Sequence, residues 1–309
     1  MNSAPTIVGL GEVLWDLFPD GPRFGGAPAN FACMAAELAG ESARVHMVSA
    51  VGNDNLGRRA LGELRAHGVN ASTLPAIDLP TGRVNVRLDI AGHAEYEIST
   101  NVAWDAITWS EEQGRLARTA DAVCYGSLAQ RADASRQTIQ AFVDATPPQS
   151  LRVFDVNLRA PFWTPDILLQ SLERATVVKL NEHELPALAE LLSLGGTVEE
   201  QLHAIRKRYR LHIVALTRGD RGSILADERG VSVEPAIPVT VADTVGAGDA
   251  FTAALTVGLL ASRPLDEVHR LAAEVAAFVC EQPGATPRLP PEIHQLFAFD
   301  RRPGSGSSS

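Results

Sequence analysis

The sequence predicts an α/β fold, in which helices cover both faces of a mainly parallel central sheet and a small second β-sheet lies at one edge. Short apolar runs of strand length alternate along the chain with longer segments in which apolar residues recur at helical spacing. That alternation is typical of βαβ units in a parallel sheet. One segment instead alternates strictly between polar and apolar residues, which is the pattern of a strand with one face in water.

The apolar runs predict the strands of the central sheet, and the segments between them have the spacing of helices that connect parallel strands. The expected strands are Thr6–Leu10, Val45–Val51, Ala122–Tyr125, Leu151–Val156, Val177–Leu180 and His212–Leu216. The expected helices include Leu56–His67, Ser135–Ala145 and Glu182–Leu192.

The strictly alternating segment is Arg83–Ile90, which is followed by the turn Ala91–His93 and a second short strand, Glu95–Ser99. This pattern predicts a hairpin with one polar and one apolar face. A half-polar hairpin does not suit a sheet that helices cover on both sides. We therefore expect it to form a flap over one edge of the molecule, joined by residues near Val13–Phe18.

The composition is that of a globular protein that needs no disulfide bonds or structural metals. The 309 residues are 45% hydrophobic and 21% charged, and a chain of this length buries roughly three quarters of the surface of its unfolded form. The cysteines Cys33, Cys124 and Cys280 are far apart, and none belongs to a C-x-x-C pair. They are predicted to be small apolar core residues of a protein in a reducing compartment.

The charge pattern argues against nucleic acid or an anionic membrane as the main partner. The net charge is −10, and no dense stripe of lysine and arginine occurs. The chain does not open with a basic segment followed by an apolar run, and it has no stretch of about 18 apolar residues. We expect no signal peptide, no membrane span and a cytoplasmic location. Residues 301–309 have the composition of a linker and are expected to be disordered.

The strongest functional signal is the segment Asp243–Phe251, which opens a very apolar helix. Its small residues Gly246, Ala247 and Gly248 allow the backbone to approach a ligand, and the free N–H groups and dipole of a helix start attract anions. A carboxylate such as Asp249 would repel a bound phosphate. The arrangement makes sense if Asp249 accepts the proton of a hydroxyl that attacks the phosphate. Such phosphoryl transfer depends chiefly on positioning and charge stabilisation.

The ordered string at 243–251 resembles the C-terminal signature of the PfkB (ribokinase-like) family of carbohydrate kinases. The resemblance implies that Asp249 is the catalytic base and that the amides of Gly246, Ala247 and Gly248 hold the transferring phosphoryl group. It also implies ATP and Mg²⁺, and in several relatives K⁺ beside an aspartate that corresponds to Asp243. Taken alone, a glycine pair and an aspartate would indicate only a tight turn and an ordinary helix cap.

A second motif lies near the N-terminus, where Gly25 and Gly26 precede a helix that carries Asn30 in its first turn. Such a pair is more often a simple turn, but the matching residues of the family hold sugar hydroxyls. Asp16 interrupts an apolar run. It is either an exposed strand residue or, as the resemblance implies, a carboxylate that accepts sugar hydroxyls. These four residues are predicted to contact the substrate.

The middle of the chain carries the run Asp155–Arg159 at the carboxyl end of a predicted strand, where open α/β sheets bind ligands. Similar D-x-N-x-R runs in fructokinases and 2-keto-3-deoxygluconate kinases face the substrate and the γ-phosphate. The resemblance therefore assigns Arg159 to the substrate and Asn157 to the nucleotide. A surface salt bridge is the alternative for Arg159.

The next predicted strand ends with Asn181 and Glu184, which match the N-x-x-E motif of the family. In the family this motif orders the waters around Mg²⁺, an ion that suits one or two carboxylates together with substrate oxygens. Zinc is discounted, because no second His or Cys lies at ligand spacing from His183.

Two further segments resemble the nucleotide loops of the family. Thr217, Gly219 and Gly222 follow another strand, although a plain β-turn would explain them equally well in isolation. Gln282–Ala285 resembles the adenine-side loop. Many relatives carry an asparagine near the base on the preceding helix, but this chain has Ala273–Ala277 there. The adenine contacts of that helix therefore stay open.

Together the motifs predict one ribokinase-like kinase domain over residues 1–300, with a β-sheet lid formed by about residues 12–24 and 80–104. We expect an ATP-dependent carbohydrate kinase that acts on a small-molecule sugar and forms a homodimer through the lid. Fructose is the expected substrate, because Gly11-Glu12, Pro19, the D-x-N-L-R run and Ala103–Asp105 look most like fructokinases.

Other functions within the same fold stay open. A 2-keto-3-deoxygluconate kinase would need a cation for the substrate carboxylate, which Arg87 or Arg159 could supply. Ribokinase is a further alternative. A sugar- or nucleotide-binding protein without chemistry belongs to a different class, and the intact Gly-Ala-Gly-Asp and N-x-x-E motifs argue against it.

Overall fold

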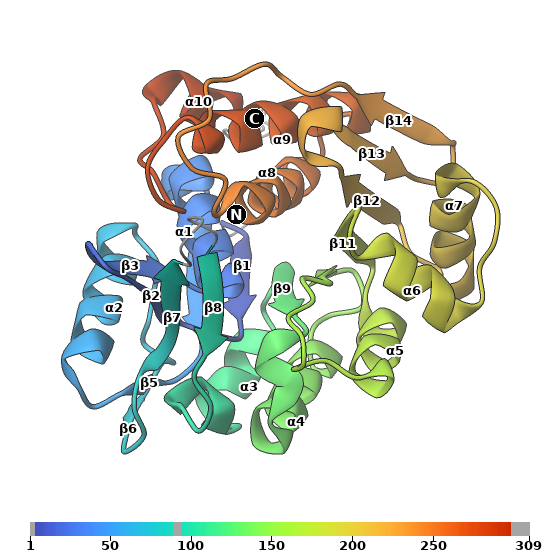
Figure 1. Ribbon diagram of the computed structural model, residues 1–309. Helices are drawn as coiled ribbons and strands as arrows, with labels where there is room; N and C mark the ends of the chain where they lie inside the picture. Colours follow the sequence, from blue (N-terminus) through green and yellow to red (C-terminus); the bar gives the residue numbers. More distant parts are fainter. Residues whose placement is uncertain (1–3, 89–93, 298–309) are drawn as a thin grey trace, which may run out of the picture.

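The computed structural model describes residues 4–88 and 94–297, and its largest element is an eight-stranded sheet (Figure 1). Neighbouring strands from β12 to β4 pair in parallel, whereas β13 and β14 extend one edge in antiparallel fashion. The predicted, mainly parallel central sheet is confirmed. In spatial order the strands are β14 (Val231–Glu234), β13 (Ser223–Ala226), β12 (Ile213–Thr217), β11 (Val177–Asn181), β10 (Leu151–Asp155), β9 (Ala122–Gly126), β1 (Thr6–Leu10) and β4 (Arg44–Val48).

Helices cover both faces of this sheet, because successive strand residues point to opposite sides. Ile7 packs into the hydrophobic core on one face, and its neighbour Val8 packs into the core on the other. The first core contains residues of α1 (Ala27–Ala39), α2 (Asn55–Ala66), α8 (Ala247–Leu260), α9 (Leu265–Cys280) and α10 (Pro291–Leu296). The second contains residues of α3 (Glu111–Ala117), α4 (Asp133–Asp144), α5 (Pro165–Arg174), α6 (Leu185–Leu192) and α7 (Val198–Tyr209).

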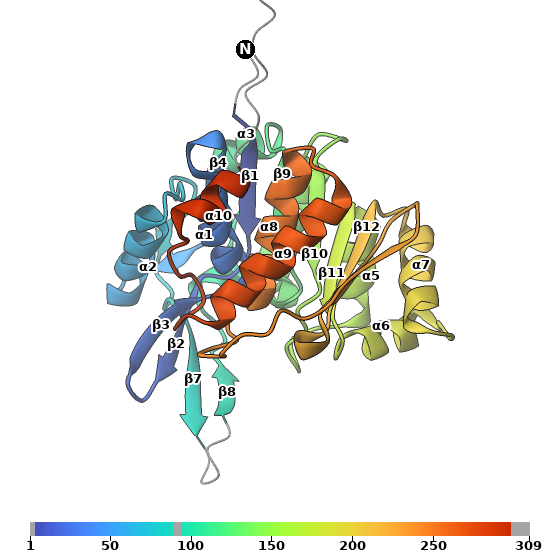
Figure 2. The same ribbon diagram turned by 90° about the horizontal axis from the view of Figure 1, so that it is seen from above.

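The helices α1 and α8 lie side by side although they are far apart in the sequence (Figures 1 and 2). Ala29, Ala32 and Ala35 of α1 and Ala250 and Ala254 of α8 are fully buried, and their small side chains allow two helices to approach closely. The two helix N-termini meet, because the side chains of Asn30 and Asp249 are hydrogen-bonded to each other. This helix pair therefore determines where the predicted motifs come together.

A separate four-stranded sheet, called the small sheet below, confirms the predicted second β-sheet. Its strands, in spatial order, are β3 (Gly21–Gly25), β2 (Leu14–Phe18), β7 (Gly82–Leu88) and β8 (Ala94–Ile98). Figure 2 shows β7 and β8 projecting from the body of the molecule. The indole of Trp15 fixes β2 to α2 by donating a hydrogen bond to the carbonyl of Leu56 at 3.0 Å. The predicted turn at 91–93 and the tail 301–309 lie outside the described residues.

The prediction of one strand over Val45–Val51 is wrong, because the chain forms two strands there. β4 ends at Val48, and β5 (Val51–Gly52) pairs instead with β6 (Ala76–Ile77) in a third, two-stranded sheet. Ser49 and Ala50 between them are fully buried, so the apolar pattern shows no break.

The described residues also form four short 3₁₀ helices: η1 (Gly40–Ser42), η2 (Ala103–Ala106), η3 (Leu128–Arg131) and η4 (Gly219–Arg221).

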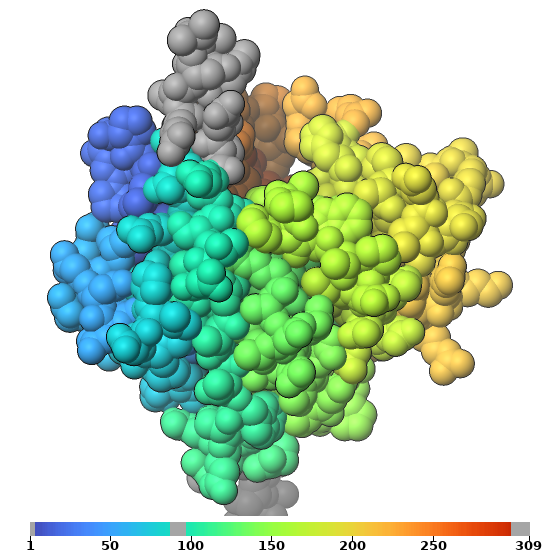
Figure 3. All heavy atoms as spheres, turned by 60° about the horizontal axis from the view of Figure 1, so that its bottom comes forward, coloured from blue at the N-terminus to red at the C-terminus, as the bar shows by residue number. Residues whose placement is uncertain are grey.

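The surface of the molecule follows the course of the chain across the sheet. In Figure 3 the blue and cyan segments lie at one side of the visible face and the yellow segments at the other, with the green segments between them.

Among residues 4–88 and 94–297, none of the helices combines the length and apolar character that crossing a membrane requires.

Phe251 on α8 offers a test of the core between the helices. Its side chain is 1% exposed, and its ring lies edge-on to that of His269 with the centroids 6.3 Å apart. Phe251→Ala should lower the free energy of unfolding by about 3–5 kcal/mol because it leaves a cavity, as measured by urea denaturation. Val233→Ala, at a side chain that is 53% exposed, is the matched control and should change it by less than about 0.5 kcal/mol. Equal losses would contradict the described packing.

Candidate active site

The N-terminus of α8 lies at the centre of the candidate site. Gly246 caps the helix with a φ of 82°, in the left-handed region that favours glycine. A Cβ atom at this position would lie 2.4 Å from the carbonyl oxygen of Ala285, so glycine also allows the two loops to approach. The first N–H groups of a helix lack partners within it. Together with the helix dipole, the free N–H groups at such a helix start favour an anion, and the anion site at Ala247 and Gly248 stays a prediction.

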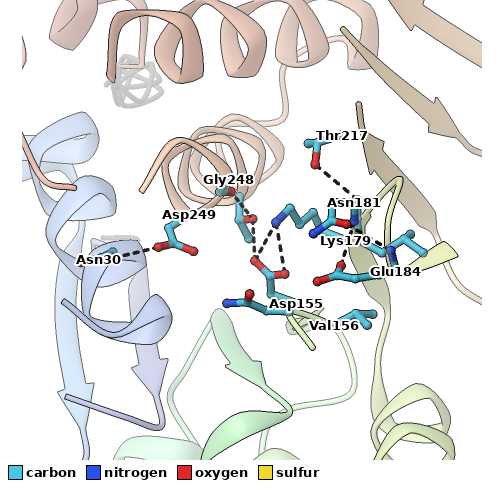
Figure 4. Close-up of polar contacts among 12 residues, drawn as sticks. Asn30, Asp155, Val156, Lys179, Asn181, Glu184, Thr217, Gly248 and Asp249 are labelled. Carbon is cyan, nitrogen blue, oxygen red and sulfur yellow. Dashed lines mark hydrogen bonds and ion pairs between the residues drawn. The ribbon is translucent and has the colours of Figure 1, made fainter. Parts of the chain in front are cut away.

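Asp249 lies in the first turn of α8 and is held by Asn30 (Figure 4). The amide Nδ2 of Asn30 donates a hydrogen bond to Oδ2 of Asp249 at 2.8 Å. Burial raises the pKa of Asp249 to about 7, and the charge of Asp155 adds to the rise while Lys179 and Asn30 oppose it. A carboxyl group with a pKa near neutrality can accept a proton under physiological conditions.

The predicted substrate residues Asp16, Gly25 and Gly26 lie beside Asn30. A Cβ atom at Gly25 would be 2.8 Å from Oδ2 of Asp16, and the backbone N–H of Asn30 donates to the carbonyl of Gly26 at 2.8 Å. Burial raises the pKa of Asp16 to about 6, against the opposing charges of Arg159 and Arg23.

Arg159 is exposed, and its guanidinium group donates to the carbonyl of Leu158 at 3.0 Å. Its positive charge opposes the rise in the pKa of both Asp16 and Asp249. The structure thus brings Asp16, Gly25, Gly26 and Asn30 together, whereas Arg159 acts on this group through its charge.

A cleft of about 680 Å³ lies on the other side of the α8 N-terminus. Thr217, Gly219 and Gly222 line one wall, and Ala247 and Gly248 line another. The predicted nucleotide loop and the predicted anion site therefore face one cleft, whose volume is typical of a small-ligand site. The remaining lining is largely apolar and includes Ile237, Pro238, Ala273, Ala276, Ala277 and Cys280.

Asn157, Asn181 and Glu184 are not part of that lining, and the last two hold loops at the carboxyl end of the sheet. The carboxylate of Glu184 accepts the backbone N–H of Leu158 at 3.0 Å and that of Asn181 at 2.8 Å. The side chain of Asn181 accepts the N–H of His183 at 2.9 Å. This turn is the reason that α6 begins at Leu185 rather than at the predicted residue 182.

The residues at the site fit a water-mediated Mg²⁺ ion but not a protein cage for a metal. Among the residues described, no three His, Cys, Asp or Glu side chains are grouped so that they could hold an ion. Each oxygen of Glu184 already accepts one N–H but keeps a second lone pair. Mg²⁺ commonly uses one or two carboxylates, water and substrate phosphates.

The carboxylate of Asp243, the residue predicted to lie beside K⁺, has partners on both oxygens. Its Oδ1 accepts the N–H of Val245 at 3.0 Å, and its Oδ2 lies 3.4 Å from the N–H of Gly284. Arg23 of the small sheet approaches Oδ2 to 3.9 Å. A potassium ion at this position would share the carboxylate with the arginine, and the site stays a prediction.

Sequence reasoning assigned no role to two buried charged groups at this site. Glu12 is 3% exposed, and its Oε2 has no hydrogen-bond partner among the described residues. Burial raises the pKa of Glu12 to about 7. Lys179 forms an ion pair with Asp155 at 3.2 Å, and both side chains are buried. The lysine among the apolar residues Val177, Val178 and Leu180 of β11 was the signal in the sequence for this pair.

Residues 21–292 match the family model described as pfkB family carbohydrate kinase. The chain belongs to this family. A fructokinase from Salmonella typhimurium is 31% identical over 300 residues, which cover 91% of this chain and 95% of the relative. The fold, the family and the predicted class of enzyme, a carbohydrate kinase, are thereby confirmed.

Solved structures of other sugar kinases share the fold of this carbohydrate kinase. A sugar kinase from Pyrococcus horikoshii in complex with ATP has a TM-score of 0.77 and 29% identity, and the match covers 91% of this chain and 94% of that one. A fructokinase from Vibrio cholerae O395 in its fructose, ADP and calcium ion bound form has a TM-score of 0.79 and 24% identity, with 96% and 99% covered.

Glu184 permits a test of its structural role in this kinase. Glu184→Ala leaves two loop N–H groups without their acceptors, so the free energy of unfolding should fall by about 2–4 kcal/mol. Urea denaturation should give the same loss in Mg²⁺ and in EDTA. Glu184→Gln keeps one oxygen acceptor and should lose less. A loss seen only with Mg²⁺ present would mean that the carboxylate acts through the metal instead.

Proposed function

We propose that this carbohydrate kinase is a fructokinase, which transfers the γ-phosphoryl group of ATP to a hydroxyl of fructose. The observation that carries the proposal is the position of Asp249, a carboxyl group with a pKa of about 7 at an anion-binding helix N-terminus. The sugar-side residues lie on one side of it, and the cleft lined by Thr217 lies on the other. The 31% identity to a fructokinase supports fructose as the acceptor.

The transfer step follows from the chemistry of the sugar-side residues and of the cleft that would hold the nucleotide. Asp16, Gly25, Gly26 and Asn30 would orient the sugar so that one hydroxyl meets Asp249. As this oxygen forms its bond to the γ-phosphorus, Asp249 takes the hydroxyl proton, and the bond from phosphorus to the bridging oxygen of ADP breaks. Because such a transition state is loose, most of the acceleration would come from alignment and charge stabilisation.

The remaining predicted residues would hold the phosphate groups. The N–H groups around Gly246, Ala247 and Gly248 would stabilise the charge on the transferring group. Thr217, Gly219 and Gly222 would contact the nucleotide. A bound Mg²⁺ ion would neutralise phosphate charge, with Glu184 holding it through water and Asn157 and Asn181 nearby. A K⁺ ion at Asp243 would add positive charge beside the same loop.

The small sheet would act as a lid over the sugar within a single kinase domain of residues 1–300. Asp16 lies on β2 of this sheet, so closure would bring its carboxylate onto the substrate. A closed lid would exclude water, which competes as a phosphoryl acceptor. We further propose that two copies associate through their lids and that the enzyme works in the cytoplasm.

A 2-keto-3-deoxygluconate kinase is the second candidate, and Arg159 is the observation that favours it. Its exposed guanidinium group acts on Asp16 and Asp249, where it could pair with a substrate carboxylate. The side chain of Arg87, the other predicted cation, is outside the described residues.

A coupled assay of ADP release should separate these activities. We expect kcat/KM to be highest for fructose among fructose, ketodeoxygluconate, ribose and adenosine. Arg159→Lys, which keeps the charge but loses the planar fork, should affect ketodeoxygluconate more than fructose if both are phosphorylated. Preference for ketodeoxygluconate would establish the second candidate, and no turnover with any acceptor would indicate a binding protein.

Asp249→Asn tests the catalytic base. Asparagine has nearly the same shape and can still accept the hydrogen bond from Asn30, but it cannot take a proton. We expect kcat to fall by about a factor of 10³ or more, while the affinity for ATP, measured by calorimetry, stays within about threefold. A variant with near-normal kcat would refute the proposed role of Asp249.

A further inference from the structure

The ion pair between Lys179 and Asp155 lies inside the protein, next to the first turn of α8 (Figure 4). The two residues face each other on the neighbouring strands β11 and β10. The ammonium Nζ lies 3.2 Å from each carboxylate oxygen, and the two side chains are only 6% and 5% exposed. Burying two charges is costly, and apolar residues of the same volume often serve stability as well or better. Packing alone therefore does not explain the pair.

The pair is in contact with the first turn of α8. A Cβ atom at Gly248 would lie 2.9 Å from Nζ of Lys179, so the ammonium group lies against the backbone of the anion site. The hydroxyl of Thr252 is 2.9 Å from the carbonyl oxygen of Gly248 and 3.3 Å from Oδ2 of Asp155. The helix start, the lysine and the aspartate thus form one connected polar network.

The surroundings of Asp249 carry opposing charges. Asp155 on β10 and Glu12 after β1 contribute carboxyl groups, whereas Lys179 on β11 and Arg159 after β10 are positive. Asn30 of α1 contributes the neutral hydrogen bond, and Glu184 faces Lys179 from the start of α6. Among these groups, Lys179 is the cation that is buried beneath Gly248.

The charge of Lys179 is maintained although the side chain is buried. Burial alone would lower the pKa of Lys179, but the carboxylates of Asp155, Glu184 and Asp249 outweigh it and raise this pKa. Asp155 raises the pKa of Asp249, and Lys179 lowers it. The two members of the pair therefore act on Asp249 in opposite directions.

We propose that Lys179 is a positioning residue for phosphoryl transfer, held by Asp155 beneath Gly248 so that its ammonium group adds positive charge to the anion site. This inference rests on the proposed function, because it assumes that a phosphoryl group occupies the N-terminus of α8. The lysine would act through the first turn of the helix, by fixing the backbone around Gly248 and by favouring the ionised form of Asp249.

The test compares Lys179→Met, Asp155→Asn and the double variant. Asp249 acts as a base when ionised, so kcat/KM rises with pH through its pKa. Loss of the cation should raise that pKa and move the rise to higher pH, by about one unit at an effective dielectric constant near 20. Loss of the anion in Asp155→Asn should move it to lower pH. A purely structural pair would give no shifts, or shifts in the same direction, and that result would overturn the inference.

The double variant keeps the test decisive if Lys179→Met fails to fold because Asp155 is left unpaired. It contains no unpaired buried charge from this pair and should fold. Because the positive charge is still missing, kcat should stay about 100-fold below that of the wild type, a loss similar to that of an oxyanion-hole donor. Recovery of kcat to within threefold of the wild type would overturn the inference.

Glu37→Gln is the matched control. Glu37 is another buried carboxylate, 7% exposed, and it pairs with His67 at 3.0 Å on the far part of α1. This variant should lose stability without shifting the pH dependence. A shift as large as that of Lys179→Met would mean that any buried ion pair has this effect, and the inference would be wrong.

A measurement without substrates separates the inference from the proposed function. The ionisation of Asp249 can be followed by ¹³C NMR of labelled aspartate, with Asp249→Asn to assign the signal. Opposite pKa shifts in Lys179→Met and Asp155→Asn would support the charge role even if none of the tested sugars is phosphorylated. Unchanged pKa values would overturn it even if the wild type proves to be an active fructokinase.

Discussion

The packing of α1 against α8 is the constraint on which the rest of the site depends. Both helices are buried on most sides, and they place Asn30 and Asp249 within a hydrogen bond of 2.8 Å. The predicted sugar-side motif precedes one helix, and the predicted anion site lies at the start of the other. Because neither helix can shift without disturbing the common core, the two motifs are held in a fixed position relative to each other.

Burial of carboxyl groups at this helix junction also determines the pH range in which they titrate. Three carboxyl groups, those of Glu12, Asp16 and Asp249, have pKa values raised to between about 6 and 7, mainly because water is excluded from them. The surrounding cations limit that rise. The site thus combines carboxyl groups that titrate near neutrality with a helix N-terminus that favours negative charge, which is a combination suited to a reaction that moves a proton and an anion together.

The sequence was sufficient to predict the layered fold, the parallel strands of the large sheet and the motif at Asp249, because these depend on local periodicity and on an ordered string of residues. The antiparallel edge strands β13 and β14 were not predicted. It could not show the contact between Asn30 and Asp249, which are 219 positions apart. It also missed the break after Val48, since Ser49 and Ala50 are as buried as the strands they separate. The bond of Glu184 to Asn181 lies within the N-x-x-E motif, but its bond to Leu158, 26 positions away, is a tertiary contact that the motif does not show.

The small sheet is built from two hairpins, and each hairpin is inserted between two consecutive elements of the rest of the molecule. β2 and β3 lie between β1 and α1, and β7 and β8 lie between β6 and η2. Among the described strands, the parallel pairing of β2 with β7 joins the two insertions. The hairpins can therefore lengthen, shorten or change sequence without altering any strand of the large sheet. The architecture separates the part that would meet the sugar from the helix pair that carries Asn30 and Asp249, so that acceptor preference could change while the geometry of this pair is kept.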